Sequence, residues 1–370
     1  MNESMSSGVA RINSVVVGSG EAPEISANPD PLADRLNGRT RTNGKATIYD
    51  IAKLAGVNAS TVSRALSKPD RVSSKTRKLV EDTAANLNYH ANPFARALPT
   101  GRTGTLGLIV ADITNPTFFD IIRGAGTAAA ANNYTVTFAE SAESPATELT
   151  TARRMLAAVD GLILGSPRMD DEQIRTLANI KPVVVINREV RGVTSVVPDV
   201  STGIGEAVRN LAANGHQRLS YVSGPPESWM SSQRWESIRS ACEWSRLEAV
   251  HLPSTKPTVD GGRRLARELL ASGATAVLTY NDLLAIGLMQ ELQAAGVLIP
   301  DQISIVGFDD IFGADFTTPP LTTVRSPLSD CGTKAAELML EAITSDAGVS
   351  SVHVETELVV RGSSGRLMPP

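Results

Sequence analysis

Apolar residues recur at helical spacing between residues 47 and 66, where the sequence reads TIYDIAKLAGVNASTVSRAL. The two apolar faces consist of Ile48, Ile51, Ala52 and Ala55 in the first half and of Val62, Ala65 and Leu66 in the second. Thr47 is placed to cap the first helix with Asp50 as its capping-box partner, and Gly56 is placed to end it. The pattern predicts a helix-turn-helix, with an ordinary helical hairpin as the alternative.

The next stretch predicts a third helix and a short connector. A turn at SKPDR is followed by Ser73 or Ser74 as the cap of a helix running to about Leu87. The residues expected to cover the first two helices are Leu79, Val80, Thr83 and Leu87. Residues 93 to 98 can form one or two helical turns that Pro99 stops, and a glycine-containing linker follows. The alternative for this connector is a tether without structure.

From residue 106 onward, short β-rich runs alternate with amphipathic helices. The predicted strands are LGLIVAD (106–112), YTVTFA (134–139), GLILG (161–165), PVVVIN (182–187), RLSYVSG (218–224), AVLTY (276–280) and ISIVGFD (303–309). The helices between them are expected to begin near residues 118, 148, 203, 233 and 283. Continuous apolar strands interleaved with helices predict parallel sheets covered on both faces. About 260 residues in this alternation are better divided into two doubly wound lobes than gathered into one.

The domain organisation follows from these patterns. Residues 1–45 are rich in Ser, Gly, Pro, Asn and charge and are expected to form a disordered tail. A helix-turn-helix headpiece at 46–90 and a hinge helix with its linker at 91–104 come next. The core occupies 105–370, with one lobe formed by 105–200 plus 322–335 and the other by 201–321 plus 336–370. The predicted fold is thus an all-α headpiece joined to an α/β core of two doubly wound parallel-sheet lobes.

Charge is distributed unevenly along this chain. The net charge is −4, yet residues 46 to 102 carry nine Lys or Arg against four Asp or Glu. A basic segment attached to an acidic body suggests that the segment alone meets a polyanion. The chain has no apolar run of about 18 residues and no secretory leader pattern, so we expect a cytoplasmic protein without a membrane span. Cys242 and Cys331 match no metal spacing, and neither a metal nor a cofactor is expected.

Polar residues follow the ends of four predicted strands. They are Asp112, then Asn187 with Arg188, then Asn281 with Asp282, and finally Asp309 with Asp310. In doubly wound folds ligands bind at the carboxyl ends of the strands, and between two lobes this location is a cleft. Carboxylates, amides and aromatic faces suit a polyhydroxylated ligand such as a sugar. The alternative for Asp282 is that it simply caps the helix that follows it.

Several motifs together resemble one family. The run from Ala46 to about Val110, including VSSKTRKLVEDTAANLNYHANPFARAL, looks like the start of a lactose-repressor (LacI/GalR) family regulator. The body resembles that family through VDGLIL, GHQRLSYVSGP, TYNDLLAIGLM, IPDQISIVGFDD, LTTVRSP and TELVVRGSS. The resemblance covers essentially everything after residue 45. It implies a periplasmic-binding-protein-like core and a homodimeric, non-enzymatic repressor that binds a near-palindromic double-stranded DNA operator under the control of a small polar effector, expected to be a sugar.

The resemblance implies roles for individual residues. In the headpiece, the second helix enters the major groove; Ala59, Ser60 and Arg64 read base edges, Asn58, Thr61 and Ser63 meet phosphates, and Thr47 and Tyr49 add DNA contacts. Arg64 is the strongest reader because a guanidinium can bond guanine O6 and N7 together. In the hinge, Leu98 matches a minor-groove wedge and Ala95 the small residue where paired hinge helices touch. In the core, the effector contacts are Phe118, Phe119, Asn187, Trp229, Arg234, Asn281 and Asp309.

Two other classes of protein were weighed. An enzyme is disfavoured because His90, His216, His251 and His353 form no cluster at the strand ends, and the chain has no P-loop, nucleophile elbow or GxGxxG after a strand. A transport-type sugar-binding protein would share the two-lobed body. It would need a signal peptide and would not carry a basic helical headpiece.

Overall fold

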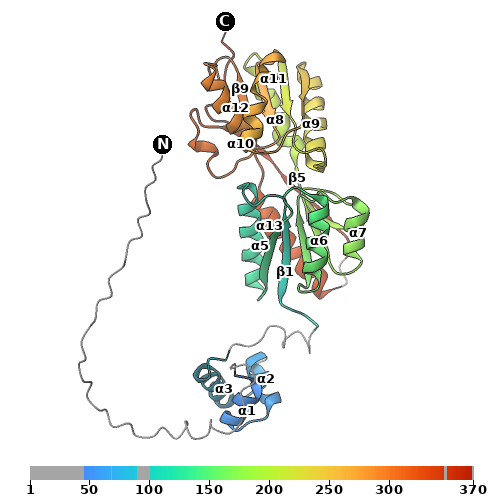
Figure 1. The fold of residues 1–370 in the computed structure, drawn as a ribbon, viewed down its shortest axis with the longest axis vertical. Coiled ribbons are helices and arrows are strands. Elements are labelled where there is room, and N and C mark those ends of the chain that lie inside the picture. The colour runs from blue at the N-terminus through green and yellow to red at the C-terminus, as the bar shows by residue number, and fades with distance from the viewer. Residues whose placement is uncertain (1–45, 68, 90–100, 346–347, 369–370) are drawn as a thin grey trace, which may run out of the picture. The chain divides into compact units, whose positions relative to one another are not determined.

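The structure, a computed structural model, describes residues 46–67, 69–89, 101–345 and 348–368. Contacts between residues divide the chain after His90 into two compact units, the headpiece and the core (Figure 1). The proposed tail at 1–45 and the proposed hinge helix lie outside the described residues.

The headpiece consists of α1 (Ile48–Ala55), α2 (Ala59–Ser67), the 3-10 turn η2 (Pro69–Arg71) and α3 (Ser74–Asn86). The capping box is confirmed, because Thr47 and Asp50 bond each other's backbone N–H groups. Gly56 ends α1 with a φ of 65°, a left-handed conformation that glycine adopts without strain. Leu79 is 47% exposed, so its predicted covering role was wrong. Val80 and Leu87 do pack into this core as predicted, together with the buried Ala84.

The first lobe of the core is built on a six-stranded parallel sheet in the order β11-β5-β4-β3-β1-β2. Its strands are β1 (Thr105–Val110), β2 (Thr135–Glu140), β3 (Gly161–Gly165), β4 (Val183–Ile186), β5 (Thr194–Asp199) and β11 (Ser351–Glu355). On one face pack α5 (Thr117–Ala131) and α13 (Leu328–Thr344), and on the other α6 (Pro145–Leu156) and α7 (Asp171–Ala178). Burial on both faces explains why the central strands β1, β3 and β4 are apolar without alternation, whereas the edge strands β2 and β11 are largely exposed.

The second lobe contains a sheet in the order β12-β10-β9-β8-β6-β7, in which only β12 runs antiparallel to its neighbour. Its strands are β6 (Arg218–Val222), β7 (Glu248–Leu252), β8 (Ala276–Thr279), β9 (Ser304–Asp309), β10 (Thr322–Arg325) and β12 (Glu357–Val359). Its helices are α8 (Val200–Ala213), α9 (Trp229–Ser245), α10 (Val259–Arg264), α11 (Ala266–Ala271) and α12 (Asp282–Ala294), with the 3-10 turn η3 (Ala314–Phe316). The two lobes confirm the predicted fold class (Figure 1).

The last segments of the chain do not all lie in the lobe to which the sequence assigned them. Residues 322–325, expected in the first lobe, form β10 and pair with β9 in the second. Residues 336–355, expected in the second lobe, complete α13 against α5 and add β11 beside β5. The chain therefore crosses between the lobes after Asp199, after Arg325 and at Thr356. The Thr356 hydroxyl donates to the Asp199 carbonyl at 2.7 Å, which ties two of these crossings together.

Candidate functional site

The exposed face of α2 carries the residues expected to meet DNA. Ser60, Ser63 and Arg64 are exposed, and Ala59 and Thr61 are partly buried. The Arg64 guanidinium folds back along the helix, where Nε donates to the Ser60 carbonyl at 3.2 Å and Nη2 to its hydroxyl at 3.4 Å. These bonds are to exposed groups of the same helix, so they compete only weakly with an external acceptor.

Three further headpiece residues lie around this helix. Tyr49 on α1 is 72% exposed. Asn58, just before α2, is exposed as well. The Thr47 hydroxyl donates to the Asp50 carboxylate at 2.7 Å, and this bond lowers the pKa of Asp50. Ala95 and Leu98 fall outside the described residues.

In the core, residues with left-handed backbone gather where strands end. Non-glycine residues with positive φ follow β2, β3, β4 and β9: Ala142, Glu143, Ser166, Asn187, Asp309 and Asp310. Such conformations are uncommon for residues with a Cβ and cluster at ligand sites in proteins. Two of them, Asn187 and Asp309, were predicted from the sequence as effector contacts.

A buried chain of polar contacts joins the two lobes at this edge. Arg234 of α9 pairs with Asp309 at the end of β9, with Nη2 2.9 Å from Oδ1. The other carboxylate oxygen of Asp309 accepts the hydroxyl of Thr117, the first residue of α5 in the first lobe, at 3.0 Å. The side chains of Arg234 and Asp309 are only 5% and 7% exposed. Two of the predicted residues are thus brought together.

Aromatic rings hold the arginine in place. The Arg234 guanidinium carbon lies 3.6 Å from the centroid of the Phe308 ring and 4.9 Å from that of Tyr280. Arg234 also donates to the Tyr280 carbonyl. A guanidinium over an aromatic face is attracted by the quadrupole of the ring, most strongly when both are shielded from water.

A second contact between the lobes involves residues that the sequence analysis did not select. Arg168, after β3, is buried, pairs with the partly exposed Glu143 at 2.6 Å and approaches the Tyr280 hydroxyl at 3.5 Å. Burial lowers the pKa of Arg168, but Tyr280 and Glu143 raise it further, so the net change is upward. The signal in the sequence was a charged residue just after a strand, in GSPRMDD. Tyr280 directly follows β8, whereas Thr117 begins α5 and lies seven residues after the end of β1.

Asn187 presents an unused acceptor at the end of β4. Its side chain donates to the Ser166 hydroxyl at 2.8 Å, while its Oδ1 is buried without a hydrogen-bond partner among the described residues. The Ser141 hydroxyl, which follows β2, is also buried and unpaired within that part of the chain. A buried acceptor without a partner carries a desolvation cost that a ligand donor would remove.

The remaining predicted effector residues take different positions. Asn281 caps α12: its Oδ1 accepts the Leu284 N–H at 3.0 Å and its Nδ2 donates to the Pro257 carbonyl at 3.0 Å. Phe118 is buried in the core of the first lobe, whereas Phe119 beside it is 43% exposed. Trp229 begins α9 and is partly buried.

Asp282 is the fully buried neighbour of Asn281. A cap of α12 was the alternative role for Asp282, but the capping side chain is that of Asn281. Burial, together with the nearby carboxylates of Asp309 and Asp310, raises the pKa of Asp282 to about 8, although hydrogen bonds from Thr323 and from the Ile311 backbone oppose this.

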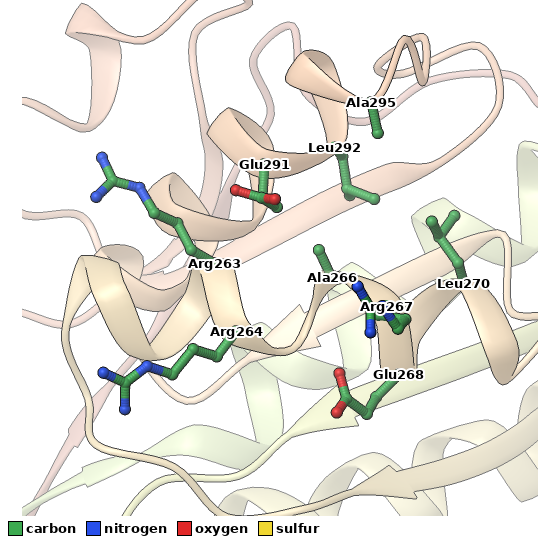
Figure 2. A pocket seen from close by; sticks show the side chains of 9 residues that line it. All are labelled: Arg263, Arg264, Ala266, Arg267, Glu268, Leu270, Glu291, Leu292 and Ala295. Atoms are coloured by element: carbon green, nitrogen blue, oxygen red, sulfur yellow. The ribbon is translucent and has the colours of Figure 1, made fainter.

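Two hollows on the second lobe contain none of the predicted effector residues. One, of about 470 Å³, lies between α10, α11 and α12 and is lined by charged side chains and by apolar ones, among them Leu292 (Figure 2). The charged residues are Arg263, Arg264, Arg267, Glu268 and Glu291. Another, of about 310 Å³, lies between the first turns of α9 and the ends of β6 and β7. Each hollow lies within one lobe. In the described ranges, no cluster of His, Cys, Asp or Glu fits a metal ion, and no helix is long and apolar enough to cross a membrane.

Comparison with known proteins agrees with this architecture. A profile described as bacterial regulatory proteins of the lacI family matches residues 47–92, and one described as a periplasmic binding protein-like domain matches residues 208–364. The HTH-type transcriptional repressor CytR of Escherichia coli K12 is 32% identical over 331 residues, which cover 87% of this chain and 97% of CytR.

Two solved structures are similar to the chain. The lac repressor dimer bound to operator and the anti-inducer ONPF matches with a TM-score of 0.79 at 24% identity, covering 87% of this chain and 99% of that one, and this likeness shows the fold. A complex of the transcriptional regulator CelR with cellobiose matches with a TM-score of 0.65 at 28% identity, covering 86% and 100%. With the headpiece, the two lobes and the extent of the match to CytR, the chain belongs to the LacI/GalR family of transcriptional regulators.

Proposed function

We propose that this protein is a homodimeric repressor whose affinity for a near-palindromic DNA operator is controlled by a sugar bound between the two lobes of the core. The observation that carries the proposal is the buried contact chain Thr117, Asp309, Arg234, which joins the lobes at the carboxyl ends of their strands. A ligand that competes for Asp309 changes a contact between the lobes. Differential affinity of about 1 to 3 kcal/mol for two lobe arrangements alters DNA binding several-fold to over a hundredfold.

The chemistry of this edge favours a sugar as the effector. Asp309 offers a carboxylate, Arg234 a guanidinium and Asn187 an unpaired carbonyl oxygen, and together these groups both accept from and donate to ring hydroxyls. Trp229 and Phe119 add aromatic surface, because they lie in α9 and α5, the helices that carry Arg234 and Thr117. The relative CelR was solved with cellobiose, which supports the same ligand class here. The hollows lie within one lobe, so a ligand there would not bridge the lobes.

A second copy of the chain is the proposed partner of the core. Phe312 and Phe316, beside η3 in the second lobe, are 77% and 68% exposed and pack edge to face with centroids 5.1 Å apart. Exposed aromatic pairs of this kind are typical of protein interfaces. A two-fold dimer presents two headpieces to two half-sites, which is why a near-palindromic operator is proposed.

In the headpiece, we propose the division of roles that the sequence suggested. Arg64 reads a base, with short contacts from Ala59 and Ser60, while Asn58, Thr61 and Ser63 position the helix on the backbone. Thr47 and Tyr49 add further DNA contacts. Ala95 and Leu98 are proposed to act in the hinge at the minor groove. The protein would work in the bacterial cytoplasm, where its operator is.

The effector proposal is tested by thermal stabilisation with a panel of monosaccharides, disaccharides, purines and phosphorylated sugars. We expect a sugar to raise the melting temperature of the wild type but not that of Asp309→Ala, because the carboxylate that binds ring hydroxyls is gone. Asp301→Ala, an exposed carboxylate elsewhere in the same lobe, is the matched control and should respond like the wild type. Stabilisation by a purine alone, or equal stabilisation of the Asp309 variant, would contradict the proposal.

The role of Arg64 is tested by fluorescence anisotropy with DNA from around the protein's own gene. We expect Arg64→Ala to weaken specific binding by about 1 to 3 kcal/mol and to relax base preference at one position of each half-site. Lys53→Ala, which removes an exposed charge from α1, should instead weaken binding to all sequences alike and reduce the salt dependence. If the Arg64 variant lost affinity equally for all sequences, Arg64 would be a phosphate contact and not a reader.

A further inference from the structure

The loop that follows β9 holds Asp309 in a conformation that needs support. Asp309 has a φ of 101° and Asp310 a φ of 56°, two consecutive left-handed residues that both carry a Cβ. Such conformations are unfavourable for residues with a Cβ and persist only when surrounding contacts hold them. Two sets of contacts flank this pair.

Asp282, at the start of α12, binds the loop from within the lobe. Its Oδ2 accepts the backbone N–H of Ile311 at 2.9 Å, two residues beyond Asp309. Its Oδ1 accepts the hydroxyl of Thr323 on β10 at 2.6 Å. The Asp282 side chain is completely buried. One carboxylate thus joins α12, β10 and the loop.

Gly307 on β9 leaves the space that this carboxylate occupies. A Cβ built on Gly307 would lie 2.0 Å from Asp282 Oδ1, closer than any real contact. The backbone of β9 and the Asp282 side chain therefore fit together only because residue 307 has no side chain. Asp282 therefore lies against the chain on both sides of Asp309: at Gly307, two residues before it, and at Ile311, two residues after it.

Asp310 is held on its other side by two arginines. Its Oδ2 lies 2.8 Å from Arg325 Nε and its Oδ1 2.7 Å from Arg361 Nη2. With Asp310 and Ile311 both fixed, the backbone of Asp309 is held in the position from which its carboxylate reaches Arg234 and Thr117.

We propose that Asp282 is a positioning residue for the effector site: it does not touch the effector, but it holds the loop after β9 so that Asp309 faces Arg234 and the first lobe. This inference rests on the proposed function only for its consequence, since the placement of Asp309 is a property of the protein alone. Asparagine can replace the aspartate in this role, because its Oδ1 accepts the Ile311 N–H and its Nδ2 donates to the Thr323 hydroxyl.

The test uses NMR of the full chain without any effector. The Nε–H signal of Arg234 reports its position, because the guanidinium stacks on Phe308 and the ring shifts that signal. We expect Asp282→Ala to move the signal toward that of an unstacked arginine and to make exchange of the Ile311 amide at least about tenfold faster. Asp282→Asn should keep both close to the wild type. Leu211→Ala, a buried change in α8, controls for general loss of stability and should leave the Arg234 signal in place.

Gly307→Ala supplies an independent variant should Asp282→Ala fail to fold. Its new Cβ pushes the Asp282 carboxylate away from the loop, so it should move the Arg234 signal in the same way. An unchanged Arg234 signal in Gly307→Ala and in Asp282→Ala would overturn the proposal. It would also be overturned if Asp282→Asn shifted the Arg234 signal as much as Asp282→Ala does. If the sugars stabilised Asp309→Ala as much as the wild type, the effector role of Asp309 would be refuted, but the NMR result on Arg234 would stand. Failure of the proposed function can therefore be distinguished from failure of this inference.

Discussion

Replacing Arg234 with leucine is expected to lower the free energy of unfolding by about 3 to 5 kcal/mol. The substitution leaves the Asp309 carboxylate buried without its cation, and removing one partner of a buried ion pair is far more costly than removing both. The stacking of the guanidinium on Phe308 and Tyr280 is lost as well. All three tryptophans, Trp229, Trp235 and Trp244, lie in α9, so tryptophan fluorescence during urea unfolding reports on the second lobe directly.

The double variant Arg234→Leu with Asp309→Asn is the matched control for this prediction. It removes the unpaired charge while keeping an amide that can still accept the Thr117 hydroxyl. We expect it to recover a large part of the stability lost in the single variant, so that the two changes are strongly non-additive. Equal losses in the single and double variants would mean that packing on Phe308, and not the buried charge, accounts for the effect.

The helices and strands were predictable where local signals were strong. GLILG at 161–165 is β3 with the same bounds, and Thr47, Asp50 and Gly56 form the predicted caps of α1. An apolar run bounded by turn residues and a helix with a capping box are both encoded within a few residues. The fold class followed from their alternation.

The assignment of the last segments to lobes was not predictable in this way. Whether β10 and α13 belong to one lobe or the other depends on which sheet and which helix they meet. β10 pairs with β9, sixteen residues earlier, whereas α13 packs on α5, almost two hundred residues earlier. Periodicity identifies an element and its buried face but does not identify the partner. The strands assigned to the wrong lobe are also short: β10 has four residues and β11 five.

The residues of the candidate site also fall into those that a local sequence signal identifies and those that it does not. Asn187 and Asp309 were found because they follow apolar strands directly. Asn281 follows a strand too, yet the structure uses its side chain as a cap, and the two uses share one sequence signal. Arg168 and Tyr280 also come shortly after strands, but their contact with each other across the lobes depends on packing that no local pattern records.

Replacing Gly287 with alanine is expected to destabilise the second lobe by about 1 to 3 kcal/mol or more, because overpacking forces the backbone to move. A Cβ on Gly287 of α12 would lie 1.9 Å from the Val259 carbonyl oxygen of α10, and one on Gly262 of α10 would lie 2.2 Å from that of Leu284. The glycines of each helix therefore face the backbone of the other. In the first lobe, Gly124 of α5 and Gly332 of α13 face each other's helices in the same manner.

Gly205→Ala in α8 is the matched control, and it should have the opposite sign. The neighbour closest to its Cβ is the end of the flexible Arg209 side chain, 3.2 Å away, which can move aside. Alanine within a helix is favoured over glycine by up to about 1 kcal/mol. Both variants are the same glycine-to-alanine change within a helix. Urea unfolding followed by tryptophan fluorescence should therefore show free energies of unfolding that differ by several kcal/mol between them. Similar stabilities would mean that α10 and α12 can move apart freely. Close packing of the two helices would then not explain the position of α12, which carries Asn281 and Asp282 at its start.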